Sequence, residues 1–326
     1  MKLFRRQFLN LVGVAAALPA VSQVVYAQSW PSKTIRVIIP TGAGSAADVI
    51  PRIIFEPLSA QLGQPIIVEN RPGAGGTLGT NVVAKAQSDG YTLLAISSSY
   101  TVLPWLYPKL PYDAVHDLSA VISLGSLPTV LVTSPAKGFK TIGELVAAAK
   151  AKPGSFNYTS TGIGNATHLN AERFRASAGI TAVHIPVKSG PEALTEVMSG
   201  RADFYFCPIG IALPFIRDGK VRGLVVSAPS RVHELPDVPT TEEAGFANAD
   251  YTFWIGLFAP AKTPRSIVHR LRDETARTLE SANVRDKLAL LGVVPQSMTP
   301  EQFDASIRDE IALNAVLVRA AGIGPE

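Results

Sequence analysis

The strongest constraint on the fold is a repeated order of segments: a short β-rich run, a loop of small residues and a helical stretch. In the first part of the chain this order places strands at 34–40, 65–69 and 91–97, with loops at 41–47 and 71–76. Strands that alternate with helical patterns form right-handed βαβ units and a parallel sheet. These residues therefore predict one α/β unit.

The same order restarts after a proline-rich join near residue 128. Thr141 and Glu144 predict a capping box at the start of one helix. The expected strands are 129–133, 156–159, 182–186, 202–206 and 221–227, with helices at 141–150, 165–178 and 191–198. A second α/β unit is therefore expected before residue 250.

The C-terminal segment is expected to return to the first unit. A strand at 252–259 precedes two long helices at 264–281 and 300–321, each with a threonine cap (Thr263, Thr299) and a proline at its first position. Helices of that length need a sheet to cover. The predicted lobes are 28–127 plus 251–326 (lobe one) and 128–250 (lobe two), with a ligand cleft between them and two crossings at a hinge.

Residues 1–27 have the pattern of an export signal. Lys2, Arg5 and Arg6 precede an apolar stretch at 9–21 that is too short for a membrane anchor, and cleavage is expected after Ala27. The run RRQFL at 5–9 resembles a twin-arginine signal, and an ordinary secretory leader is the alternative. Both interpretations place the mature protein in the bacterial periplasm.

Charge and cysteine content exclude several classes of function. The leader holds three basic residues and no acid, so the rest has 27 basic against 26 acidic residues and no broad basic field for nucleic acid. Cys207 is the only cysteine, so it forms no internal disulfide, and we expect it to be buried. The five histidines show no metal-binding spacing. We expect no metal and no cofactor.

Ligands of open parallel sheets bind beyond the carboxyl ends of the strands. In both units, nearly all residues at these positions are glycine, hydroxylic or otherwise small, and Lys188 is the only charged one. The candidate ligand-binding residues are Thr41, Gly42, Ala43, Gly44, Ser45, Gly75, Ser97, Ser98, Ser160, Thr161, Gly162, Gly164, Asn165, Lys188, Ser189, Gly190 and Pro208. Lys188 would pair with a ligand carboxylate, unless it is simply a solvated surface lysine.

Two of these loops match the Ser-x-x-Asp/Glu pattern that opens a helix. Ser45 precedes Asp48, and Ser189 precedes Glu192, at the same spacing. A helix start offers free N–H donors and about half a positive charge, which suits a small carboxylate. Ordinary helix capping without a ligand is the alternative. Asp48 and Glu192 are interpreted as caps near the site, and Asp48 as a cap rather than a general base.

Two exported enzymes remain as alternatives. Residues 42–47 (GAGSAA) after a strand, with Glu69 ending the next one, match a dinucleotide-binding fingerprint, although the periplasm lacks a free NAD pool. Ser134 and Lys137 give the S-x-x-K spacing of a serine acyl-enzyme. In such enzymes the nucleophile motif comes before an S-D-N motif. Here SDG (88–90), which imitates S-D-N, precedes Ser134, so the order is wrong for that class. The receptor interpretation is therefore favoured.

Several motifs carry a resemblance to a known family. After the first glycine loop and Asp48 come GQPIIVENRPGAGG (63–76), SDGYTLL (88–94), LPYD (110–113), KPG (152–154), HIPVK (184–188), GKVR (219–222) and LPDVPT (235–240). Together they resemble the Bug receptors, the periplasmic solute-binding proteins of tripartite tricarboxylate transporters.

The resemblance implies a two-lobed type II (Venus flytrap) receptor, each lobe a mainly parallel sheet flanked by helices. Such a receptor delivers a small organic carboxylate to integral-membrane permease subunits and catalyses nothing. The resemblance also implies that main-chain groups at 41–45, 160–165 and 188–190 grip the carboxylate. Val187 and Ser189 stand where the family usually has tyrosine and glycine, so tricarboxylates, dicarboxylates, amino acids and aromatic acids all remain open as ligands.

Overall fold

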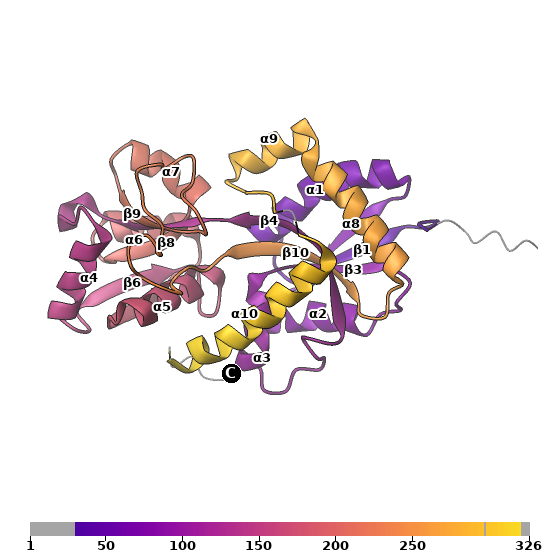
Figure 1. Cartoon of the computed structure of the whole chain (residues 1–326), viewed down its shortest axis with the longest axis horizontal. Helices are drawn as coiled ribbons and strands as arrows, with labels where there is room; N and C mark the ends of the chain where they lie inside the picture. Colours follow the sequence, from indigo (N-terminus) through magenta and orange to yellow (C-terminus); the bar gives the residue numbers. More distant parts are fainter. Residues whose placement is uncertain (1–29, 297, 321–326) are drawn as a thin grey trace, which may run out of the picture.

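The computed structural model describes residues 30–296 and 298–320. The expected leader at 1–27 lies outside the described residues. Within the described ranges, no helix combines the length and apolar character needed to cross a bilayer. The described chain forms two five-stranded sheets, each covered by helices, at opposite ends of the long axis of the molecule (Figure 1).

The first sheet has the strand order β2-β1-β3-β10-β4. Its strands are β1 (Ile35–Ile39), β2 (Ile66–Asn70), β3 (Thr92–Ser97), β4 (Leu118–Leu127) and β10 (Phe253–Pro260). β1 pairs parallel with β2 and β3, whereas β10 runs antiparallel to both β3 and β4. The first βαβ units are therefore confirmed.

The second sheet has the order β7-β6-β8-β5-β9. Its strands are β5 (Thr129–Thr133), β6 (Phe156–Ser160), β7 (Ala182–Pro186), β8 (Phe204–Pro208) and β9 (Arg222–Ser227). β6 pairs parallel with β7 and β8, and β5 pairs antiparallel with β8 and β9. In each sheet four of the five strands therefore run in the same direction, with β10 and β5 as the exceptions, and the prediction of mainly parallel sheets is confirmed.

The one reversed strand of each sheet, β10 in the first and β5 in the second, lies at a crossing between the lobes. β4 leads from the first sheet directly into β5 of the second, with only Pro128 between them, and β10 is the strand that returns (Figure 1). The strands on either side of residues 127/128 and 250/251 belong to different sheets, which supports the proposed lobe boundaries.

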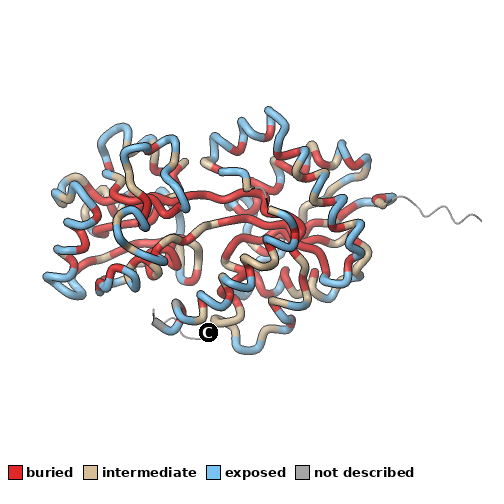
Figure 2. The backbone as a smooth tube through the Cα atoms, viewed as in Figure 1, coloured by how far each residue is buried: buried red, intermediate tan, exposed pale blue. Residues whose placement is uncertain are grey.

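Helices cover both sheets and leave the strands buried between them (Figure 2). Lobe one carries α1 (Ala46–Leu62), α2 (Thr77–Ala84), α3 (Leu103–Leu106), α8 (Arg265–Glu280), α9 (Ala282–Leu290) and α10 (Pro300–Ala320). Lobe two carries α4 (Ile142–Ala151), α5 (Ala166–Ala178), α6 (Gly190–Met198) and α7 (Ile209–Arg217). Short 3₁₀ turns lie at Ala74–Gly76, Ser98–Val102 and Pro135–Lys137.

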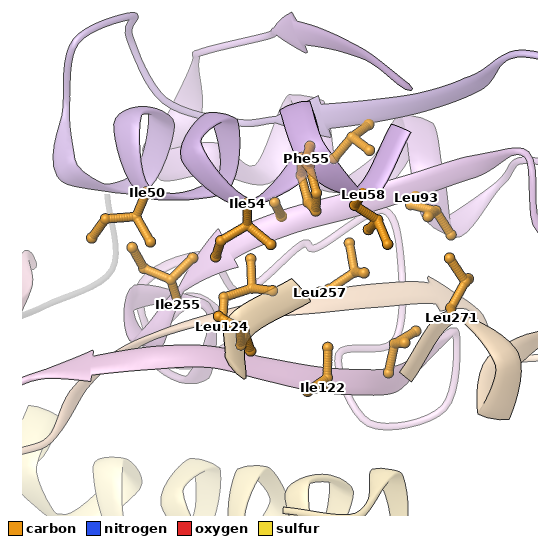
Figure 3. Close-up of a cluster of buried hydrophobic side chains, with 14 of the residues drawn as sticks. Ile50, Ile54, Phe55, Leu58, Leu93, Ile122, Leu124, Ile255, Leu257 and Leu271 are labelled. Atoms are coloured by element: carbon orange, nitrogen blue, oxygen red, sulfur yellow. The ribbon is translucent and has the colours of Figure 1, made fainter. Parts of the chain in front are cut away.

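The core under α1 fixes the position of the first glycine loop. Ile50, Ile54 and Leu58 recur at helical spacing and are each at most 1% exposed. They pack against Leu93 and Leu257 of the sheet (Figure 3). Burial of this stripe holds the first turn of α1 in place at the carboxyl end of β1.

Four elements have no counterpart in the sequence prediction. Strand β4 and the four-residue helix α3 both lie between the predicted strand 91–97 and the join near residue 128, where no element is expected. Helices α7 and α9 were also missed, since α7 contains Pro214 and α9 is short. The expected cap at Thr263 is wrong, because Pro264 itself holds the N-cap position without a side-chain hydrogen bond. The caps at Thr141 and Thr299 are confirmed.

Candidate functional site

A cavity of about 550 Å³ lies between the two lobes. Lobe one contributes the loop after β1, the turn at 73–76, the end of β3 and the segment through α3. Lobe two contributes the loop after β6 and the starts of α5, α6 and α7. The predicted location of the site, between the carboxyl ends of strands in two lobes, therefore contains a cavity of ligand size.

Ten of the predicted site residues line this cavity: Thr41, Gly42, Ser45, Gly75, Ser97, Thr161, Gly164, Asn165, Gly190 and Pro208. They come from both lobes. The two walls also touch, since a Cβ atom at Gly164 would lie 3.0 Å from Leu106 of the opposite lobe.

Seven predicted residues do not line the cavity: Ala43, Gly44, Ser98, Ser160, Gly162, Lys188 and Ser189. Ser98 and Ser160 are fully buried behind the wall, where Ser98 accepts a hydrogen bond from Tyr251 and Ser160 bonds His184. Lys188 is exposed, and it does not line the cavity. Its main-chain N–H donates a hydrogen bond to the Glu192 carboxylate. The structure thus does not support Lys188 as the charge partner of a ligand.

Sequence reasoning missed most of the apolar wall. The additional lining residues are Pro40, Ala46, Ala47, Gly73, Gly76, Ser99, Leu103, Leu106, Tyr107, Thr129, Ile163, Ala166, Thr167, Tyr205, Ile211 and Phe253. Ile163 lies inside the predicted loop 160–165, and Tyr205 lies in the predicted strand 202–206, three residues before Pro208. Closeness in sequence to predicted site residues was therefore a signal that could have identified both. Ile211 lies on the unexpected helix α7 and gave no such signal.

The start of α1 is open toward the cavity. Ser45 is the N-cap residue, but its side chain accepts no hydrogen bond from the helix and instead pairs with the Thr41 hydroxyl at 3.1 Å. Asp48 accepts a hydrogen bond from the N–H of Gly44 at 2.8 Å, one residue before the cap. The predicted capping box is therefore wrong at Ser45. The first-turn amides of Ala46 and Ala47 remain available at the cavity wall.

Asp48 is held as an anion beneath this loop. Burial disfavours its charge, but hydrogen bonds from Gly44, Asn70 and Arg52, with the Arg52 charge, lower its pKa. Arg52 Nε lies 2.8 Å and Asn70 Nδ2 2.9 Å from the Asp48 Oδ1 atom. Its structural role as an anchor of the loop agrees with the interpretation that it is not a general base.

Of the three helix starts that lobe two places at the cavity, α5 and α6 are capped by side chains, whereas α7 follows Pro208 without a side-chain cap. Asn165 accepts hydrogen bonds from the N–H groups of Thr167 and His168, and its amide donates to the Thr161 hydroxyl at 2.6 Å. Ser189 accepts a hydrogen bond from the Glu192 N–H at 3.4 Å. This second predicted box is confirmed at its serine, and its glutamate reaches back to Lys188 rather than to Ser189.

We expect Asn165→Asp to separate capping from binding. The aspartate keeps the acceptor for the helix amides, so the free energy of unfolding should change by less than about 0.5 kcal/mol. It also places a negative charge in the cavity wall, so carboxylate binding should weaken by about tenfold or more. Chemical unfolding and calorimetry measure the two quantities. Asn165→Ala is the comparison, with an expected loss of about 1 kcal/mol of stability.

A stacked histidine pair supports the loop after β6 from below. The rings of His168 and His184 are stacked with centroids 4.0 Å apart. The Gly164 N–H donates to His168 Nδ1 at 3.0 Å, and His184 Nε2 lies 2.7 Å from the Ser160 hydroxyl oxygen. Burial lowers the pKa of His168 to about 3 and that of His184 to about 4. Both rings are therefore neutral at neutral pH.

Acid is expected to destabilise the protein through this pair. Between pH 6.5 and about 4 the unfolded chain binds protons that the folded histidines do not, so stability falls as the pH falls. We expect a loss of about 3 kcal/mol between pH 6.5 and 5, measured by denaturant unfolding. His184→Gln should reduce this dependence, whereas His233→Gln, at an exposed position, should not. Equal slopes in all three proteins would contradict the assignment.

The enzyme alternatives find no support in the geometry. Lys137 forms an ion pair with Asp203 at 2.7 Å, so the S-x-x-K lysine is already paired. Glu69 pairs with Arg71 at 2.6 Å. Within residues 30–296 and 298–320, no group of His, Cys, Asp and Glu side chains is arranged to hold a metal ion. Cys207 is buried, and burial raises its pKa.

Comparison with known proteins decides the family. The sequence profile of the tripartite tricarboxylate transporter family receptors, TctC, matches residues 50–323. This chain belongs to that family. TctC-family proteins are solute-binding receptors and not enzymes, so the two enzyme alternatives are set aside.

Individual members agree with the TctC assignment. Protein BugT of Bordetella pertussis is 34% identical over 320 residues, which cover 97% of this chain and 98% of BugT. Among solved structures, R. palustris Rpa4515 with adipate has a TM-score of 0.77 at 27% identity, covering 91% of this chain and all of that one. MatC from Rhodopseudomonas palustris with bound malate has a TM-score of 0.73 at 30% identity, covering 88% and 99%. The two-lobed periplasmic-binding-protein fold is thereby established for this TctC-family receptor.

Proposed function

We propose that this TctC-family receptor is exported to the periplasm, captures a small organic carboxylate between its lobes and delivers it to the permease subunits of a tripartite transporter. The observation that carries the proposal is the cavity whose one wall holds the uncapped start of α1. Free amides and the partial positive charge of a helix start favour an anion. Relatives of the same fold hold adipate and malate, which are both carboxylates.

Binding would also draw the lobes together. The lobes are joined by two crossings, at β4–β5 and before β10, and they meet across the cavity at Gly164 and Leu106. A ligand that contacts both walls binds the closed arrangement better than the open one, and so shifts the population toward it. A permease could then distinguish loaded from empty receptor by shape.

The experiment is a calorimetric screen of the mature protein, from residue 28 onward, against mono-, di- and tricarboxylates. Each acid is paired with its carboxamide, which has nearly the same shape and no charge. We expect at least one acid to bind with a Kd of about 10 μM or lower and its amide to bind about 30-fold more weakly or not at all. Equal binding of acid and amide, or no binding by any acid, would contradict the proposal.

A further inference from the structure

We infer that Gly210 and Gly292 are positioning residues of this receptor: their backbones touch between the lobes, and the lack of a side chain at both positions lets the lobes close around a ligand. Gly210 belongs to α7 of lobe two, and Gly292 follows α9 of lobe one, and the two elements face each other across the lobe boundary (Figure 1). Neither glycine lines the cavity. The inference rests on the proposed function, because it concerns the closure that ligand capture requires.

The contact between the two glycines leaves no room for a side chain. A Cβ atom at Gly210 would lie 2.8 Å from the main-chain oxygen of Leu291 and 3.1 Å from the main-chain nitrogen of Gly292. A Cβ atom at Gly292 would lie 2.8 Å from the main-chain nitrogen of Gly210. All of these neighbours are backbone atoms, which cannot rotate away as the end of a flexible side chain can. A larger residue at either position therefore requires the backbones to separate.

The segment after α9 is fixed to lobe one. Ser126 and Val294 exchange two main-chain hydrogen bonds, of 2.9 and 2.8 Å, which tie this segment to β4 just before the crossing. Val293 is buried in the core of lobe one. Moving the segment away from its own lobe would break these hydrogen bonds and expose Val293 to water. Gly292 therefore moves with lobe one.

The start of α7 is fixed to lobe two in the same way. The N–H of Ile209 donates a hydrogen bond to the carbonyl of Pro128 at 3.0 Å. Ile209 and Ala212 are buried in the core of lobe two. Since each side of the contact is anchored in its own lobe, a side chain added at Gly210 displaces one lobe relative to the other.

The start of α7 also forms part of the cavity wall. Pro208 and Ile211, on either side of the pair Ile209 and Gly210, both line the cavity. If the start of α7 moves away from lobe one, these two side chains move with it and the cavity widens. A ligand of fixed size then loses simultaneous contact with both walls. Because only the closed fraction of the protein binds well, a smaller closed fraction raises the observed Kd in proportion.

The test measures the distance between the lobes by pulsed electron paramagnetic resonance. Spin labels are attached at Glu56→Cys on α1 and Lys188→Cys in lobe two, which are exposed positions, whereas the native Cys207 is buried and not expected to react. The mature protein is measured empty, with adipate and with malate. We expect the native protein to populate the distance of this structure in at least one sample, and Gly210→Ala to retain less than about half of that population.

Calorimetry adds a second readout on the same variant. If adipate or malate binds the native protein, its Kd should rise by about tenfold or more in Gly210→Ala. The thermal midpoint of the empty variant should not fall by more than a few degrees, because alanine is favoured over glycine within a helix and the lobes can separate without unfolding. A loss of affinity with the fold retained is what a purely structural role of Gly210 would not produce.

Two matched controls separate this contact from the general effect of replacing a glycine. Gly143 is the second residue of α4, as Gly210 is of α7, and a Cβ atom there would meet only Thr141 Oγ1, at 3.8 Å. Gly143→Ala should keep the native population. From lobe one, Gly292→Asn adds a side chain at a φ of +72°, which asparagine tolerates, and should reproduce the Gly210→Ala result. Its control is Gly63→Asn, with a φ of +69° and no atom within 4 Å of the added Cβ.

Each outcome of these measurements decides the inference. Gly210→Ala or Gly292→Asn with the native distance population would overturn it, and so would a native protein that never populates the distance of this structure. A lower thermal midpoint of Gly210→Ala with an unchanged distance population would also overturn it, because the clash would then be absorbed within one lobe. Failure of the proposed function has a different signature: no acid binds in the calorimetric screen, or acid and carboxamide bind equally, while the empty proteins still show whether the contact controls the lobes.

Discussion

Replacing Ala46 with proline is expected to weaken carboxylate binding by about 10- to 100-fold while α1 stays folded. Ala46 is the first residue of α1 and lines the cavity, so its N–H is one of the amides proposed to hold the anion. Proline removes this donor and is well tolerated at a first helical position, particularly after the extended backbone of Ser45 (φ −72°, ψ 161°). A hydrogen bond to a charged group contributes about 1.5–3 kcal/mol, which sets the expected loss.

Ala46→Val is the matched control for this substitution. It adds a similar side-chain volume at the same exposed position and keeps the N–H group. We expect its affinity to stay within about threefold of the native value, and the thermal midpoints of both variants to match the native protein within a few degrees. If Ala46→Pro binds as tightly as Ala46→Val, the amide of residue 46 does not hold the carboxylate.

A large side chain at Gly42 is expected to abolish binding by filling the cavity. Gly42 lines the cavity, its φ lies outside the left-handed region, and a Cβ atom there would meet no other atom within 4 Å. Tryptophan therefore fits without backbone strain and extends into the space meant for the ligand. We expect calorimetry with the best carboxylate to show a loss of more than about 100-fold, with unfolding of the empty protein unchanged within about 0.5 kcal/mol.

Two other glycines sharpen the Gly42 experiment. Gly143→Trp places the same side chain at an exposed position on α4, outside the cavity, and should bind normally. Gly44 is a poorer choice for blocking the cavity, because its φ of +81° strains any other residue and it does not line the wall. Gly42→Trp with full affinity would show that the ligand binds elsewhere.

The alternation of β-rich runs, small-residue loops and helical stretches in the sequence predicted the order of most elements and the location of the site. Apolar runs such as 35–39 and 182–186 are short, β-rich and bounded by turn residues, so their strands were predictable to within a residue. The glycine and serine loops after them follow from the rule that ligands bind at carboxyl ends of strands. The prediction of mainly parallel sheets is confirmed, but the sequence did not identify β5 and β10 as the reversed strands, because their direction depends on the crossings between the lobes and has no local signal.

The chemistry of the cavity wall was less accessible to sequence reasoning. Small residues marked the loops, and the apolar side chains of Leu106 and Ile211 enter the cavity from helices that no loop motif predicts. Lys188 is the only charged residue in these loops, but the sequence position of a lysine in a loop does not show which way its side chain points, and this one is exposed outside the cavity. Ser45 likewise matched a capping motif, but its hydroxyl bonds Thr41 instead.

The most direct measurement is a crystal structure of the mature receptor bound to its tightest carboxylate. The account predicts one carboxylate oxygen within about 3 Å of the amides of Ala46 or Ala47, and the rest of the ligand in the cavity between Leu106 and Ile163. A carboxylate held instead by the Lys188 side chain, with the start of α1 bonded only to water, would contradict it.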